Sequence, residues 1–150
     1  MNPSPFVLAL ITCSLLSGCD PVYLQRIRVA PPAAEASASS AIRVREPDSK
    51  GVLRLLDRVA RAHGFRSETP LRGSDAERGL AYYTQSNEPQ HTNIQISVFL
   101  RPNGVLEIRT IEGYALHPSA LTRDFTEALL SALRDSLGPD RVEVVSHWRD

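Results

Sequence analysis

The chain has 150 residues, of which 42% are hydrophobic and 23% are charged, which suits one domain with a single core and excludes two sizeable domains. Its 17 basic and 17 acidic residues are interspersed and give a formal net charge of zero. This balance argues against nucleic acid or an anionic surface as the principal ligand. Lys50 is the only Lys, and we interpret the preference for Arg as genome composition, because no local run of arginines suggests phosphate binding.

An apolar run from Phe6 to Leu16 opens the chain and leads into Leu16-Ser17-Gly18-Cys19. A membrane-spanning helix needs roughly 20 apolar residues, so this run has instead the length of a signal-peptide core. The four residues that end it resemble the lipobox of bacterial lipoproteins. The resemblance covers only this leader. It implies cleavage between Gly18 and Cys19, a diacylglycerol thioether on the Cys19 thiol and an N-acyl chain on its new amino group.

The leader departs from the usual pattern, because the stretch Met1 to Pro5 carries no Lys or Arg. The alternative is a buried N-terminal helix with Cys19 as a core thiol, but a core helix does not normally run into a polar, Pro-rich and Ala-rich stretch. The chain has two cysteines, Cys13 in the leader and Cys19. The mature domain is therefore expected to contain no disulfide, no Cys nucleophile and no Cys-ligated metal.

The lipobox resemblance also implies a location. A protein with two or three acyl chains stays with its membrane, here in the cell envelope and facing the periplasm. In lipoproteins of enteric-type bacteria, an Asp directly after the lipidated Cys favours retention at the inner membrane, and Asp20 occupies that position. The inner membrane is therefore favoured, with the outer membrane as the alternative.

Residues 19–47 contain a Pro pair and an Ala/Ser-rich middle, without helical periodicity or sustained strand alternation. We interpret them as the lipidated N-terminus and a flexible tether, which would hold a domain of residues 48–150 some tens of ångströms from the bilayer. Two apolar islands interrupt this stretch, Val22-Tyr23-Leu24 and Ile27-Arg28-Val29. We expect them to lie near the membrane surface or to pack loosely on the domain, with docking onto a partner as the alternative.

Two stretches have the periodicity of amphipathic helices. The first begins near Asp48 or Ser49 and ends at Gly64, where Phe65 folds back on the last turn. The second has Ser119 as its N-cap and ends at Gly138-Pro139. The expected core positions are Val52, Leu55, Leu56, Val59, Ala60 and His63 in the first, and Leu121, Phe125, Ala128, Leu129, Ala132, Leu133 and Leu137 in the second.

The predicted strands lie between and after these helices. Apolar and polar residues alternate from Asn93 to Arg101 and again from Val105 to Ile111. Asn103-Gly104 between these two runs predicts a hairpin with a type I′ turn. Other expected segments are a short edge strand 65–69, an exposed loop 70–78, a strand 80–86 and a closing strand 141–148.

These elements predict an α+β fold, a two-layer sandwich with an antiparallel sheet of four to five strands and two helices on one face. The other face would be wet and would display a possible binding surface around an exposed aromatic residue. An equally weighted alternative buries this aromatic residue under the loop 70–78. The surface comprises Gln95, Ser97, Phe99, Glu107 and Arg109.

No catalytic or metal motif accompanies this scaffold, so we expect no catalytic residues, no metal and no cofactor apart from the lipid. The four histidines, His63, His91, His117 and His147, do not have metal-ligand spacing within one helix. The sequence favours a non-enzymatic, membrane-anchored module that binds another envelope protein and no nucleic acid. One alternative is an immunity lipoprotein that neutralises a periplasmic toxin. The other is a small envelope hydrolase that combines His117 or His147 with Glu112 or Asp140.

Overall fold

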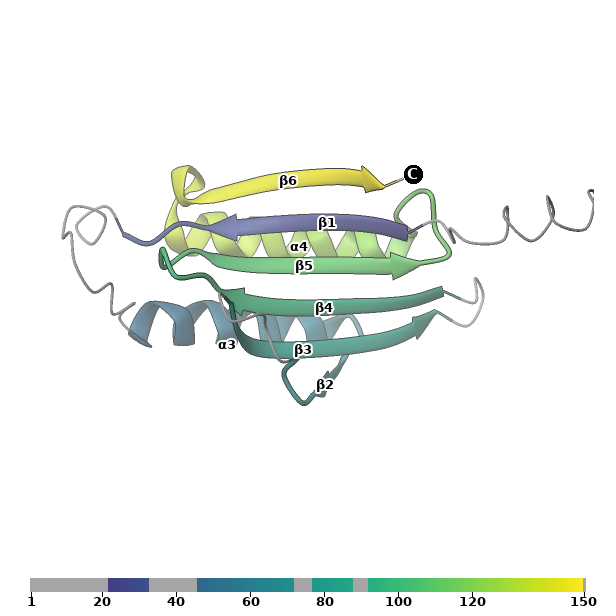
Figure 1. Cartoon of the computed structure of the whole chain (residues 1–150), viewed down its shortest axis with the longest axis horizontal. Helices are drawn as coiled ribbons and strands as arrows, with labels where there is room; N and C mark the ends of the chain where they lie inside the picture. Colours follow the sequence, from purple (N-terminus) through teal and green to yellow (C-terminus); the bar gives the residue numbers. More distant parts are fainter. Residues whose placement is uncertain (1–21, 33–45, 72–76, 88–91, 150) are drawn as a thin grey trace, which may run out of the picture.

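The computed structural model describes residues 22–32, 46–71, 77–87 and 92–149. They form an α+β domain in which a 6-stranded antiparallel sheet is covered on one face by two helices (Figure 1). The strand order is β2-β3-β4-β5-β1-β6. This confirms the predicted fold class, although the sheet has one strand more than the four to five expected.

Consecutive strands from β2 to β5 are neighbours, whereas β1 and β6 come from the two ends of the described chain. The strands are β1 (Val22–Val29), β2 (Arg66–Glu68), β3 (Arg78–Asn87), β4 (Thr92–Leu100), β5 (Leu106–Gly113) and β6 (Val142–Arg149). The helices are α3 (Glu46–Ala62) and α4 (Ala120–Leu137), and a short 3₁₀ turn, η2 (Pro139–Arg141), leads into β6.

The additional strand is β1. It lies within the predicted tether 19–47, so the prediction of a flexible tether is wrong for Val22–Val29. Val22–Val29 pairs antiparallel with β5 on one side and with β6 on the other, so it lies inside the sheet. Its inward side chains alternate with half-exposed ones, and Ile27 and Val29 are buried in the core. The folded domain therefore includes Val22–Val29, which precede its predicted start at Asp48. Residues 33–45 of the predicted tether lie outside the described residues.

The two helices end where the sequence predicts. Gly64 has a positive φ of 81°, and the Phe65 N–H donates to the Ala60 carbonyl at 3.0 Å, which stops α3. Gly138, with φ 91°, stops α4, and the Ser119 hydroxyl caps its start by accepting from the Thr122 N–H. The predicted start of the first helix, near Asp48 or Ser49, is two to three residues late, because α3 already begins at Glu46.

The predicted β4–β5 hairpin forms, with Val98 opposite Ile108. Its turn differs from the predicted type I′. Gly104 has φ 79°, whereas Asn103 does not adopt a positive φ, and the Gly104 N–H donates to the Arg101 carbonyl at 2.9 Å. Pro102 is compatible with this geometry because its ring fixes φ near −65°, so the connection is a three-residue loop with glycine at the left-handed position.

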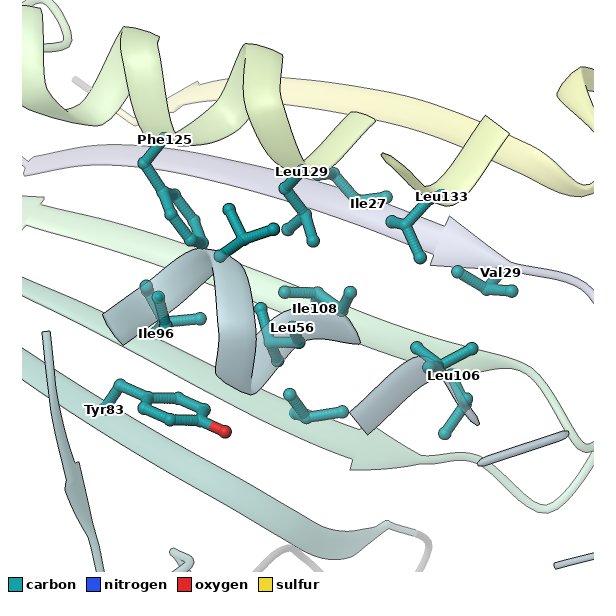
Figure 2. Close-up of a cluster of buried hydrophobic side chains, with 14 of the residues drawn as sticks. Ile27, Val29, Leu56, Tyr83, Ile96, Leu106, Ile108, Phe125, Leu129 and Leu133 are labelled. Atoms are coloured by element: carbon teal, nitrogen blue, oxygen red, sulfur yellow. The ribbon is translucent and has the colours of Figure 1, made fainter. Parts of the chain in front are cut away.

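The core fills the space between the sheet and the helices. Phe125, Leu129 and Leu133 of α4 lie over β1 and β5, and Leu56 of α3 lies over β5 and β4 (Figure 2). Phe65 packs against Phe125 with ring centroids 5.0 Å apart, which joins the end of α3 to α4. Because all this apolar surface is on one side, the polar side chains of the central strands are left on the other.

Candidate functional site

The face of the sheet turned away from the helices, called the open face here, carries the predicted binding surface. Two rows of residues cross it from strand to strand. In the first row Glu143, Arg28, Glu107 and Phe99 are successive neighbours, and in the second Arg26, Arg109 and Ser97 are. Gln95 lies on the same face, opposite Ile111. The five residues of the predicted surface therefore share one face, and their role in binding stays a prediction.

The expectation that these side chains are displayed is wrong for three of them. Phe99 is only 6% exposed, Glu107 is 0% exposed and Ser97 is buried. The guanidinium of Arg109 lies over the Phe99 ring, 4.4 Å from its centroid. Leu71 also approaches this side of the sheet.

Leu71 approaches this face at Gly79, which is the partner of Phe99 on β3. A Cβ at Gly79 would overlap the Leu71 carbonyl oxygen, so only glycine permits this close approach. Paired residues on neighbouring strands point to the same face, and Leu71 therefore lies on the side of Phe99. Phe99 is therefore buried, and Leu71 lies on its side of the sheet.

Glu107 is the centre of the site. Its carboxylate oxygen Oε1 lies 2.6 Å from Arg109 Nε and 3.9 Å from Arg26 Nε. Its Oε2 lies 2.6 Å from an Arg101 terminal nitrogen and 3.4 Å from Arg28 Nε. We call these four arginines around Glu107 the arginine cluster. Strands β1 and β5 supply three of them, and Arg101 follows directly after β4.

Two further carboxylates balance the cluster at its margins. Glu77 contacts Arg109 at 2.6 Å and Arg101 at 3.5 Å, and Glu143 contacts Arg28 at 3.7 Å. Arg26 and Arg109 are direct cross-strand partners, an arrangement of like charges that is unfavourable without a carboxylate nearby. The negative charge of Glu107 therefore stabilises the register of β1 on β5.

The cluster also controls the protonation of its members. Burial alone would raise the pKa of Glu107, but hydrogen bonds and charge from Arg109 and Arg101 hold that pKa below its ordinary value. Burial would lower the pKa of Arg109, and the hydrogen bonds and charges of Glu107 and Glu77 raise it instead. At neutral pH the cluster thus contains an ionised carboxylate among four cations.

Two N–H groups of the cluster are not satisfied. The Nε atoms of Arg26 and Arg101 are buried and have no hydrogen-bond acceptor among the described residues. Buried polar groups are nearly always hydrogen-bonded, so unsatisfied donors call for a specific explanation. The guanidinium groups themselves remain partly accessible, since the side chains of Arg26 and Arg101 are 24% and 32% exposed.

A groove of about 470 Å³ adjoins the cluster at the end of the sheet where β1 ends and β5 begins. Arg28 and Arg101 belong to both. Arg141 is fixed at its wall because its Nε and a terminal nitrogen donate to the Ala30 carbonyl at 3.0 and 2.8 Å. The groove is lined by Arg28, Ala30, Arg101, Asn103, Val105, Asp140, Arg141 and Glu143.

The surface predicted from the sequence did not include Arg26, Arg28 and Arg101, and the segment with Arg26 and Arg28 was interpreted as part of a tether. The available signal was the spacing of two residues, from Arg26 to Arg28, from Phe99 to Arg101 and from Glu107 to Arg109. This spacing places side chains on one face of a strand.

The described histidines His63 and His117 lie on separate elements, the first after α3 and the second before α4. His63 contacts the Val59 carbonyl at 2.8 Å through Nδ1 and packs edge-on against Phe125. His117 is exposed, whereas His91 and the side chain of His147 lie outside the described residues. Among the described residues, no group of three or more His, Cys, Asp or Glu could hold a metal ion.

The carboxylates considered for a hydrolase are far apart. Glu112 is buried beside the start of α4, where it accepts from the Ser119 N–H at 2.9 Å and from the Thr122 hydroxyl at 2.8 Å. Asp140 follows the other end of this 18-residue helix, about 27 Å away at 1.5 Å per residue. The structure therefore does not combine Asp140 with His117, which precedes α4.

Gly18, Cys19 and Asp20, the residues of the predicted cleavage, lipidation and sorting signals, lie outside the described residues. No helix in the described ranges is both long and apolar enough to cross a membrane. Neither a protein-family model nor a curated protein sequence matches this chain.

Proposed function

We propose that the protein is a membrane-anchored periplasmic lipoprotein and acts as a non-enzymatic binding module for another envelope protein. The lipid anchor of this proposal is the diacylglycerol and the N-acyl chain on Cys19, and the binding site is the arginine cluster with its groove. The partner brings carboxylate or carbonyl oxygens to the guanidinium groups.

The observation that carries the proposal is the convergence of four partly exposed arginines on the buried carboxylate of Glu107, their side chains being 22% to 34% exposed. Arg is enriched at protein interfaces, where its planar fork binds carboxylates with two parallel hydrogen bonds. In this protein Glu107 and Glu77 already hold the guanidinium groups in place. Binding therefore requires little further ordering of these long side chains.

The same contacts disfavour nucleic acid as the ligand. Glu77, Glu107 and Glu143 alternate with the four arginines, so the cluster does not present the uninterrupted positive stripe that a phosphate backbone requires. A protein segment with one or two carboxylates fits this pattern better, because each carboxylate replaces or supplements one existing ion pair.

Site-specific photocrosslinking in living cells tests this proposal. A photoreactive amino acid at Asp140, an exposed position on the groove wall, should give a discrete adduct with one envelope protein. The matched control is Asp124, an exposed position on α4 outside the groove, which should give none. In isolated membranes the adduct from Asp140 should weaken as salt is added, because salt screens the exposed charges. The proposal fails if Asp140 gives no adduct or the same adducts as Asp124.

A further inference from the structure

One end of the sheet collects exposed apolar side chains. It is the end where β1 begins at Val22 and β5 ends at Gly113, its partner in the register. The loop from β5 to α4 lies at this end, beside the start of β1 (Figure 1). We call Val22, Tyr114 and Leu116 the apolar end.

These three side chains are 37%, 66% and 63% exposed, in that order. Leu71 and Val144, the other large apolar residues exposed among the described ones, lie elsewhere: Leu71 follows β2, and Val144 lies within β6 opposite Ile27. Exposed apolar residues scattered singly need no explanation, but a group at one end of a small domain indicates a contact surface.

The loop that carries Tyr114 and Leu116 is fixed at both ends. Gly113 is paired with Val22, and the buried Glu112 carboxylate accepts from the Ser119 N–H at 2.9 Å. Tyr114 adopts φ 61° and is the one non-glycine residue with positive φ in the described ranges. A bulky residue in this conformation is strained, and such strain persists at sites where the side-chain position matters.

The sequence between this end and the predicted acylation site is very short. Only Asp20 and Pro21 separate Cys19 from Val22, and an extended chain spans at most ~3.6 Å per residue. The Val22 backbone is therefore within about 11 Å of the residue that carries the lipid. Two residues therefore separate Cys19 from β1, in place of the long tether 19–47 expected from the sequence.

We propose that the apolar end docks on the lipid bilayer, with Tyr114 and Leu116 in the interface between headgroups and acyl chains. The inference rests on the lipid anchor of the proposed function. Tyr suits this environment because its ring is apolar and its hydroxyl remains in the hydrated layer. Docking in this way adds apolar contact to the acyl chains and fixes the orientation of the domain.

The orientation matters for the arginine cluster and the groove. The 8-residue strand β5 runs from Leu106 beside the groove to Gly113 at the apolar end, a length of about 25 Å at ~3.3 Å per residue. With the apolar end on the bilayer, the sheet stands away from the membrane surface. The groove then opens toward the periplasm, where a partner can reach it.

Fluorescence quenching in vesicles tests the docking with the full lipoprotein. The mature chain offers no other free thiol if Cys13 is removed with the leader and Cys19 is acylated. A fluorophore on Leu116→Cys should be strongly quenched by nitroxide lipids in vesicles of phosphatidylethanolamine and phosphatidylglycerol. The control is Asn103→Cys, exposed in the β4–β5 turn at the opposite end, where quenching should be several times weaker.

Flotation of the same vesicles distinguishes a failure of the lipid anchor from a failure of the docking. Protein that floats with the vesicles but shows equal quenching at both positions is anchored and not docked, as expected if the apolar end serves a protein partner instead. Protein that fails to float overturns the anchor and the docking together. Adding Tyr114→Gly to the Leu116→Cys protein should weaken the quenching while flotation persists, and unchanged quenching would exclude a role for Tyr114.

Discussion

Arg28 Nε lies 3.4 Å from Glu107 Oε2, although the two residues are 79 positions apart in the chain. They are also direct partners in the pairing of β1 with β5. The contact connects the first strand of the domain to the centre of the candidate site. The arginine cluster therefore depends on β1, the segment whose sequence resembles a linker.

A shortened chain that begins at Asp48 should consequently fail to fold cooperatively. It lacks Ile27 and Val29 of the core, and it leaves the edges of β5 and β6 without their common neighbour. A chain that begins at Asp20 is the matched control, since it retains β1 and lacks only the predicted leader and acylated Cys. Urea unfolding followed by circular dichroism distinguishes them, and equal midpoints for the two chains would show that β1 is dispensable.

Replacing Glu107 by Gln should destabilise the domain by about 3 kcal/mol. The substitution removes the negative charge on which four arginines converge, but the loss stays at the lower end for a buried ion pair because the arginines can turn toward water. Glu143→Gln is the control, since Glu143 is largely exposed and contributes ~1 kcal/mol or less.

Equal effects of the two substitutions would contradict the central role of Glu107. The pH dependence gives a second check. Because the folded protein lowers the pKa of Glu107, its contribution is present above the pKa of the unfolded chain and is lost as pH falls through the lower folded value. The difference in unfolding free energy between wild type and Glu107→Gln should therefore persist at neutral pH and shrink only in acid.

Tyr83 should make the domain sensitive to alkali. Burial, followed by the charge and the hydrogen bond of Asp57, raises the pKa of Tyr83 from 10.0 to about 12. Its contribution is complete below pH 10 and is lost toward pH 12, because the unfolded chain releases the proton first. The loss amounts to at most ~2–3 kcal/mol. Tyr83→Phe should show a shallower decline in urea stability over this range, and parallel declines would contradict the assignment.

Tyr114→Gly should stabilise the fold by ~0.5–1 kcal/mol, since it relieves the strain of φ 61° and removes a side chain that packs little. Leu116→Gly is the matched control in the same loop, where no positive φ favours glycine. It should destabilise by ~0.5–1 kcal/mol through the greater freedom of the unfolded chain. Thermal unfolding measures both, and a lower midpoint for Tyr114→Gly would show that its backbone is not strained.

The sequence was informative where a pattern is local. The alternation on both sides of Pro102-Asn103-Gly104 predicted the hairpin, and Gly64 and Gly138 marked the helix ends, because each depends on neighbouring residues only. The sequence did not predict strand β1, because the inward side of this strand includes Gln25. The amide oxygen of Gln25 accepts from the Thr126 hydroxyl of α4 at 2.9 Å. A polar residue at that position breaks the apolar alternation, and its partner is 101 residues away.

For the same reason, only part of the candidate site could be predicted from the sequence. Glu107 and Arg109 belong to one strand and were identified together. Arg26 and Arg28 lie beside these two residues because of the register of β1 on β5, which no local sequence pattern determines. Phe99 is covered by Arg109 of the neighbouring strand, and Leu71 approaches the same side of the sheet at Gly79.

The intact mass of the protein extracted from membranes tests the proposed anchor most directly. We predict a chain that lacks residues 1–18 and carries a diacylglycerol and an N-acyl chain on Cys19. Cys13→Ser should give the same mature mass, whereas Cys19→Ala should carry no lipid. A wild-type mass that includes the leader, or an unmodified Cys19, would contradict the anchored binding module proposed for this protein.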